Sequence, residues 1–250
     1  MTPMATIVVG DVHGNSAALS DLLDRLVPEL KPEDCTVFLG DYIDRGPDAR
    51  TCIDQILQFR DAAPGTVVTL MGNHEDWLLR TYRDYTRHSW VLGMEAFETI
   101  RSYSPQAERL LRLELERAGL SLVSGRVLIP YDIFFNEVPA RHLGFLQNLK
   151  PYWRTPDAVC VHGGIDPRGA APEEQDTENL LWGTDAFPAQ YHGTDLIVYG
   201  HWNNAIINRS DWPEPNVSGR TIGIDTISHG VLTAIRLPEG RVFQSRRYVT

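Results

Sequence analysis

The chain has 250 residues, enough for one large α/β domain and at most a small second one. With 42% hydrophobic and 22% charged residues, the composition is that of a globular protein, and no apolar run is long enough to cross a membrane. The formal charge of −10 comes without a cluster of Lys and Arg, which argues against a nucleic-acid partner, and the lack of a secretory signal predicts a cytoplasmic location.

The first third of the chain alternates strands and helices. Strand-like apolar runs are expected at 5–10, 36–40 and 66–71. A helix is expected to start at Asn15 or Ser16, and another to be opened by Pro47 and Asp48. This βαβαβ order predicts a largely parallel sheet in this half of the chain.

From about 76 to 150 the pattern becomes helical and aromatic, and its low content of Gly, Ser and Pro distinguishes it from a linker. We therefore predict a helical cap insertion at about 76–150 within a single domain spanning 1–250. Further strands are expected at 158–161, 196–199, 221–224, 231–235 and 242–244. The turn at 238–240 predicts a closing antiparallel hairpin or meander, and the polar segment 203–219 predicts a loop.

Five short polar motifs each follow a predicted strand directly. They read GDVHG (10–14), GDYIDRG (40–46), GNHE (72–75), HGG (162–164) and GH (200–201). Loops at the carboxyl ends of strands in open α/β sheets converge on one crevice, so these motifs are expected to meet. Each motif alone is weak, because Asp-x-His and Asn-His are common in capped turns and loops. Their joint occurrence at strand ends indicates one site.

The polar side chains of these motifs are carboxylates, an amide and imidazoles, with no thiolate. They are Asp11, His13, Asp41, Asn73, His162 and His201. Such ligands suit hard-to-borderline divalent cations, and manganese, iron and zinc all fit them. An acidic protein that handles phosphate needs local positive charge, which bound cations supply. The sequence therefore predicts a metal site.

Together the five motifs resemble the calcineurin-like metallophosphoesterase superfamily, and closely its phosphoprotein phosphatase branch. The resemblance runs from Ile7 to about Ile235. It implies an α/β fold of the metallophosphoesterase type, a β-sandwich of two mixed sheets flanked by helices. It also implies a metal-dependent phosphoric ester hydrolase that acts on phosphorylated protein or small phosphoesters.

The resemblance assigns two divalent cations per chain, with manganese preferred and iron or zinc as alternatives. The first is expected on Asp11, His13 and Asp41. The second is expected on Asp41, Asn73, His162 and His201, so that Asp41 bridges the pair. Its two carboxylate oxygens make this reasonable. The implied reaction is direct attack of metal-bound hydroxide on phosphorus.

Three further residues receive roles in catalysis or substrate binding. Arg45 has a planar guanidinium that suits phosphate oxygens, although a structural ion pair is the alternative. The resemblance implies that His74, paired with Asp44, protonates the leaving alcohol or stabilises developing charge, and the alternative is a structural hydrogen bond. Asn73 is also expected to contact substrate.

The chain departs from the family pattern at one place. Many bacterial members carry a second phosphate-binding arginine just after a Leu-Leu-Trp block, and Thr184 stands there instead. Arg168 is the predicted substitute in substrate binding. The departure puts in doubt a direct transfer of protein phosphatase activity.

The motifs are compatible with three functions. The first is a phosphomonoesterase of the serine/threonine protein phosphatase type. The second is a bis(5'-nucleosyl)-tetraphosphatase-type nucleotide hydrolase, whose relatives share most motifs but lack the aspartate that stands here as Asp44. The third is a non-catalytic module that binds phosphorylated partners, which would require a missing ligand or acid. Because all these residues are present, the third ranks last.

Overall fold

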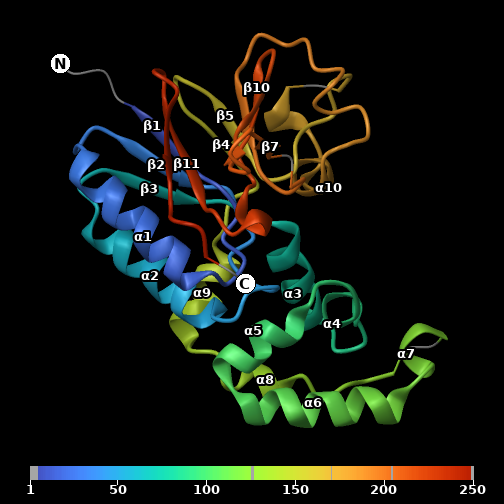
Figure 1. Cartoon of the computed structure of the whole chain (residues 1–250). Helices are drawn as coiled ribbons and strands as arrows, with labels where there is room; N and C mark the ends of the chain where they lie inside the picture. The colour runs from blue at the N-terminus through green and yellow to red at the C-terminus, as the bar shows by residue number, and fades with distance from the viewer. Residues whose placement is uncertain (1–4, 125–126, 170, 204, 249–250) are drawn as a thin grey trace.

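Two five-stranded sheets lie side by side, with helices on their outer faces (Figure 1). This computed structural model describes residues 5–124, 127–169, 171–203 and 205–248. The first sheet has the strand order β12-β11-β1-β2-β3. Its strands are β1 (Thr6–Val9), β2 (Cys35–Phe38), β3 (Thr66–Thr69), β11 (Thr233–Leu237) and β12 (Arg241–Gln244). β1, β2 and β3 are parallel, whereas β11 and β12 pair antiparallel, so the sheet is mixed.

Two amphipathic helices cover the outer face of this sheet. They are α1 (Ser16–Leu26), between β1 and β2, and α2 (Ala49–Ala62), between β2 and β3. Each buries a stripe of apolar residues at helical spacing, as the sequence predicts. Asp48 caps α2 by accepting a hydrogen bond from the Thr51 amide at 3.2 Å. Asn15 does not cap α1; its amide instead donates to the Val12 and His13 carbonyls and holds the first motif loop in place.

The second sheet has the strand order β4-β5-β6-β10-β9 and is also mixed. Its strands are β4 (Tyr152–Arg154), β5 (Val159–Val161), β6 (Ile197–Tyr199), β9 (Asn216–Ser218) and β10 (Thr221–Gly223). Val8 and Val37 from the first sheet share one buried cluster with Cys160 and Val198 from the second. This cluster is the interior of a β-sandwich, and the predicted fold class is confirmed. On the far side, helix α10 (Thr177–Trp182) packs Leu180 against the second sheet.

Between β3 and β4 the described residues form a run of helices that extends away from the sheets (Figure 1). The run consists of α3 (Asn73–Arg83), α4 (Ser89–Gly93), α5 (Ala96–Tyr103), α6 (Pro105–Ala118), α7 (Ser121–Ser124), α8 (Asp132–Phe135) and α9 (Ala140–Gln147). Trp90, Tyr131 and Phe134 are fully buried in it. They belong to the same apolar cluster as Leu19 and Ile53 of α1 and α2. The helical run therefore shares a core with the sheet region.

The carboxyl-terminal part differs from the sequence-based expectation in two ways. The segment predicted as a loop at 203–219 contains the short strands β7 (Ile206–Ile207) and β8 (Pro213–Glu214), which pair with each other, as well as β9. Strands of two residues are too short to show a period of two, so the loop prediction was wrong there. The strand β4 was also not expected. The closing hairpin of β11 and β12 is confirmed.

The described ranges also contain single turns of 3₁₀ helix. They are η1 (Val27–Glu29), η2 (Pro172–Glu174) and η3 (Ile227–His229). Among the helices in the described ranges, none combines the length and the apolar character that crossing a membrane requires.

Candidate active site

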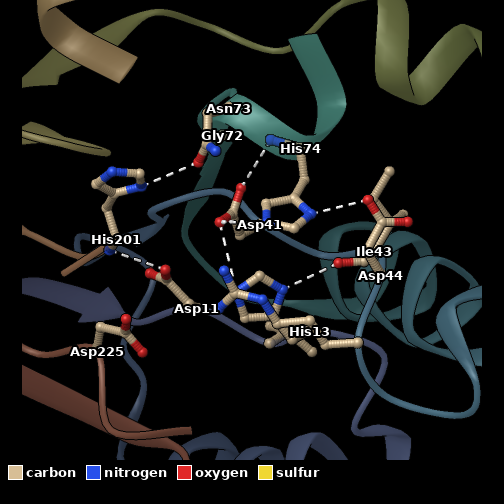
Figure 2. Close-up of polar contacts among 12 residues, drawn as sticks. Asp11, His13, Asp41, Ile43, Asp44, Gly72, Asn73, His74, His201 and Asp225 are labelled. Carbon is tan, nitrogen blue, oxygen red and sulfur yellow. Dashed lines mark hydrogen bonds and ion pairs between the residues drawn. The ribbon is translucent and has the colours of Figure 1, made fainter. Parts of the chain in front are cut away.

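Each of the five motifs begins one to three residues after a strand ends. The strands are β1, β2, β3, β5 and β6. These strands are parallel within each sheet, so their following loops lie at one edge of the sandwich. The side chains of His13, Asp41, Asn73 and His201 lie close together there, and the carboxylate of Asp11 is turned to the backbone of His201 (Figure 2). The sequence expectation that distant loops meet is thereby seen in the structure.

Asp41 lies at the centre of this group and is 1% exposed. Its Oδ2 is 3.4 Å from Nε2 of His13 and 3.4 Å from Nε2 of His162. Burial alone would raise the pKa of Asp41, but the rings of His162 and His74 outweigh it and hold this pKa well below its usual range. A carboxylate that lies within 3.4 Å of an imidazole from each of two motif loops has the placement that a bridging ligand needs.

Asn73 joins the two histidines of the second sheet. Its Oδ1 is 2.9 Å from Nε2 of His162 and 3.0 Å from Nδ1 of His201. Together with Asp41, these two histidines form a set whose ligand atoms all lie within 4.8 Å of one another. A carboxylate, an amide oxygen and two imidazoles are thus gathered in one place.

Asp11 is oriented differently from the other predicted ligands. Its Oδ2 accepts a hydrogen bond from the His201 amide at 2.8 Å, and its buried Oδ1 has no hydrogen-bond partner among the described residues. In the compact set around His13 and Asp41, the third side chain is His74. Asp225 lies beside Asp11 (Figure 2) and accepts a hydrogen bond from the Asn203 amide. Burial raises the pKa of Asp11, and the negative charge of Asp225 raises it further.

The donor set fits divalent cations. Burial lowers the pKa of His13 to about 3 and that of His201 to about 3, so both rings are neutral, as metal ligation requires. Burial also acts to lower the pKa of His162, but Asp41 and Asp11 raise it to about 9, so a cation that binds there displaces a proton. The unpartnered oxygen of Asp11 is a buried polar atom that a cation would satisfy.

Several residues of the site share a left-handed backbone conformation, which is strained for residues other than glycine. His13, Asp41, Asp44, Arg45 and His201 all have positive φ, between 43° and 67°. Non-glycine residues rarely adopt this region, and they cluster where function fixes the backbone. These residues lie in the loops after β1, β2 and β6, where the chain turns sharply after the strand.

Glu75, the last residue of the third motif, locks two of the loops together. Its carboxylate accepts hydrogen bonds from the amides of Asp41, Tyr42, Ile43 and Gly72. No role was predicted for Glu75. At Gly72 a Cβ atom would lie 2.0 Å from Oδ1 of Asp41, so only glycine allows this approach.

His74 and Asp44 form a buried pair. Nδ1 of His74 is 2.8 Å from Oδ2 of Asp44, and Nε2 of His74 is buried without a hydrogen-bond partner among the described residues, 3.9 Å from Asp41 (Figure 2). Burial acts to lower the pKa of His74, but Asp41 and the hydrogen bond to Asp44 outweigh it and raise the pKa. The hydrogen bond to Asp44 therefore fixes the orientation of the ring, with Nε2 on the side of Asp41.

Arg45 and Arg168, the two predicted phosphate contacts, lie in different surroundings. Arg45 is exposed, and its Nη1 lies 3.0 Å from Nε2 of His13, at the edge of the ligand group. Arg168 is 74% exposed, and its Nε lies 3.8 Å from Asp166. Thr184 uses its hydroxyl to donate to the Ile165 carbonyl at 3.4 Å. Only Arg45 is seen against the predicted metal ligands.

A family model described as calcineurin-like phosphoesterase matches residues 4–204, which is most of the chain. The chain belongs to the calcineurin-like phosphoesterase family. It is a metal-dependent phosphoester hydrolase, as the motifs predict.

Two relatives and one solved structure show how this phosphoesterase compares with known proteins. A symmetrical bis(5'-nucleosyl)-tetraphosphatase of Pectobacterium carotovorum is 37% identical, over 96% of this chain and 94% of that protein. Serine/threonine-protein phosphatase 7 of Arabidopsis thaliana is 26% identical, over 96% of this chain and 65% of that protein. A metallophosphoesterase structure from Sphaerobacter thermophilus matches this one with a TM-score of 0.53 and 20% sequence identity. The match covers 100% of this chain and 90% of the Sphaerobacter chain. That likeness shows the fold.

Two residues of the phosphoesterase that the sequence did not assign hold Asp44 in place. The Trp90 indole donates to Oδ2 of Asp44 at 2.9 Å, from α4. The Thr99 hydroxyl, on α5, donates to Oδ1 at 2.6 Å and accepts from the Asp44 amide at 2.7 Å. Each lies more than forty positions away in the sequence, and neither has a motif. The helical run thus fixes the carboxylate that orients His74.

Replacing Thr99 with valine is expected to lower kcat about tenfold and the free energy of unfolding by about 1–3 kcal/mol, because buried polar groups of Asp44 lose their partner. Urea unfolding and steady-state kinetics measure the two effects. Thr81→Val is the matched control, since Thr81 is equally buried but its hydroxyl donates to the Arg87 carbonyl. We expect the control to lose stability and keep kcat. Equal kcat in the two variants would contradict a role for Thr99 in positioning Asp44.

Proposed function

We propose that this phosphoesterase hydrolyses phosphate monoesters of alcohols, in the manner of a serine/threonine protein phosphatase, at a centre of two divalent cations. The observation that carries the proposal is the buried His74–Asp44 pair, 2.8 Å apart, with the free ring nitrogen of His74 facing Asp41. A departing alkoxide is a strong base and needs a proton as its bond to phosphorus breaks. A departing phosphate is a weak base and needs none.

The proposed metal ligands are those that the motifs predict. Asp11, His13 and Asp41 would hold one cation, and Asp41, Asn73, His162 and His201 the other. Manganese is our choice, and iron or zinc suits the same atoms. Bound there, the cations would supply an activated water and neutralise charge on the phosphoryl oxygens.

The protein's own groups do the remaining work. Arg45 holds phosphoryl oxygens through its guanidinium and, together with Asn73, orients the ester. Asp44 accepts a hydrogen bond from Nδ1–H of His74, which directs Nε2–H of the same ring at the leaving oxygen. Trp90 and Thr99 keep Asp44 from rotating. A contact between Arg168 and substrate stays a prediction from the sequence, as does the cytoplasmic location.

A second candidate is hydrolysis of dinucleoside tetraphosphates. It is favoured by the 37% identity, over nearly the full length of both chains, to the symmetrical bis(5'-nucleosyl)-tetraphosphatase. The same cations and Arg45 would bind a polyphosphate chain. In that reaction the His74–Asp44 pair would have little to do.

The two candidate functions are distinguished by which substrate the protein hydrolyses faster. Protein loaded with manganese is assayed for phosphate release from a phosphoserine peptide and for cleavage of diadenosine tetraphosphate under one set of conditions. We expect kcat/KM for the peptide to be at least about tenfold higher, because general acid catalysis by a positioned side chain is worth about 10²–10⁴-fold. A higher value for diadenosine tetraphosphate would overturn the proposal in favour of the second candidate. No turnover of either substrate would support a binding module.

A further inference from the structure

A pocket of about 230 Å³ opens beside the predicted metal ligands, on the side of His13 and Arg45. Two parts of the chain outside the motif loops complete its wall. The loop between α4 and α5 contributes Glu95, and the turn η3 contributes Ile227 and Ser228. A substrate whose phosphate is bound near Arg45 would place its neighbouring groups in this pocket.

Glu95 gives the pocket a negative charge next to the positive charge of Arg45. Its side chain is exposed, and its carboxylate forms no ion pair or hydrogen bond with another described residue. Its backbone is in the left-handed region, with φ 55° and ψ 34°, which is unfavourable for glutamate. Met94 and Ala96 on either side are buried, so the backbone of Glu95 is anchored at the pocket wall.

We infer that Glu95 selects substrates that carry a cation close to the phosphate, namely phosphopeptides with lysine or arginine beside phosphoserine or phosphothreonine. This inference rests on the proposed function and names its substrate class. Arg45 and the bound cations attract the phosphate, and Glu95 attracts the basic side chain a few ångströms further along the peptide. A polyphosphate chain offers Glu95 only negative charge, so the same residue disfavours dinucleoside tetraphosphates.

The experiment compares kcat/KM for four substrates, each divided by the value for p-nitrophenyl phosphate. The substrates are a phosphoserine peptide with arginine on both sides, the same peptide with alanine, the same peptide with glutamate, and diadenosine tetraphosphate. We expect the wild-type protein to prefer the arginine peptide over the alanine peptide by about three- to tenfold at low ionic strength, and the preference to shrink with added salt.

Two variants remove the charge in different ways. Glu95→Gln keeps the shape of the side chain, and Glu95→Gly also relieves the left-handed backbone, so it should fold at least as well. Both are expected to bring the arginine-to-alanine ratio close to one. Glu95→Lys is expected to favour the glutamate peptide and to raise relative activity on diadenosine tetraphosphate. Glu98→Gln is the matched control, because Glu98 lies three positions further on, in α5, and pairs with Arg101 at 2.9 Å. It should keep the wild-type ratio.

The outcomes distinguish the two proposals. If the wild-type protein hydrolyses phosphopeptides but the arginine-to-alanine ratio is near one, or survives Glu95→Gln and Glu95→Gly, the role of Glu95 is overturned while the proposed function stands. If no phosphopeptide is hydrolysed and diadenosine tetraphosphate is, the proposed function and the inference that rests on it both fall.

Discussion

Replacing Asp41 with asparagine is expected to lower kcat/KM for an aryl phosphate by about 10³-fold, a loss at the level seen when a group that stabilises transition-state charge is removed. Asp41 is the carboxylate on which His13 and His162 converge, each with Nε2 at 3.4 Å. Asparagine lacks the negative charge of Asp41 and keeps only one of its two side-chain oxygens as a possible metal ligand. Because Asp41 is proposed to bridge both cations, the affinity for both should fall.

The fold should survive this substitution. Asparagine tolerates the left-handed backbone of Asp41, at φ 51°, and can still accept the hydrogen bond from the His74 amide at 3.2 Å. Circular dichroism checks the fold, and kinetics with saturating manganese measures the loss. Asp61→Asn is the control, because this side chain is 77% exposed and contacts Arg60. Activity in Asp41→Asn within tenfold of the control would remove Asp41 from the bridging position.

Replacing His74 with glutamine is expected to have an effect that depends on the leaving group. For a phosphoserine peptide, kcat should fall by about 10²–10⁴-fold, the usual contribution of a general acid. For an aryl phosphate with an acidic phenol the fall should be about tenfold or less, because that leaving group departs without a proton. The expectation follows from the pairing of Nδ1 with Asp44 and the free Nε2 in the site.

The partner of His74 provides the matched test. Asp44→Asn should show the same dependence on the leaving group with a smaller loss, since the ring remains but its tautomer is no longer fixed. Steady-state rates over a series of aryl phosphates with phenols of different acidity give the dependence as a slope. An equal loss for peptide and aryl substrates in His74→Gln would mean that His74 does not deliver the proton.

The strand ends and their motifs were predictable because both depend on local sequence. Apolar runs predicted β1, β2 and β3, and the polar residues after each run marked the site edge. The sandwich itself followed from the family resemblance, since periodicity does not report which sheet a strand joins. Strand ends differed by at most two residues, as at β3, which ends at Thr69 and not at residue 71.

Contacts between distant parts of the chain were beyond the reach of the sequence. Trp90 looks like any core aromatic, yet its indole nitrogen bonds Asp44, 46 positions away. Glu95 has no motif, and its place beside Arg45 depends on how α4 and α5 pack against the sheet loops. Glu75 belongs to a motif, but its four amide partners come from loop closure. Residue type and spacing carry no information about such contacts.

The number and position of bound metal ions test the central claim most directly. Crystals grown with manganese, measured at a wavelength where manganese scatters anomalously, reveal each ion independently of the protein model. We predict two peaks per chain roughly 3.5–4 Å apart, the usual spacing of two-metal sites, with Asp41 between them. A single peak, or two peaks that do not share Asp41, would contradict the account.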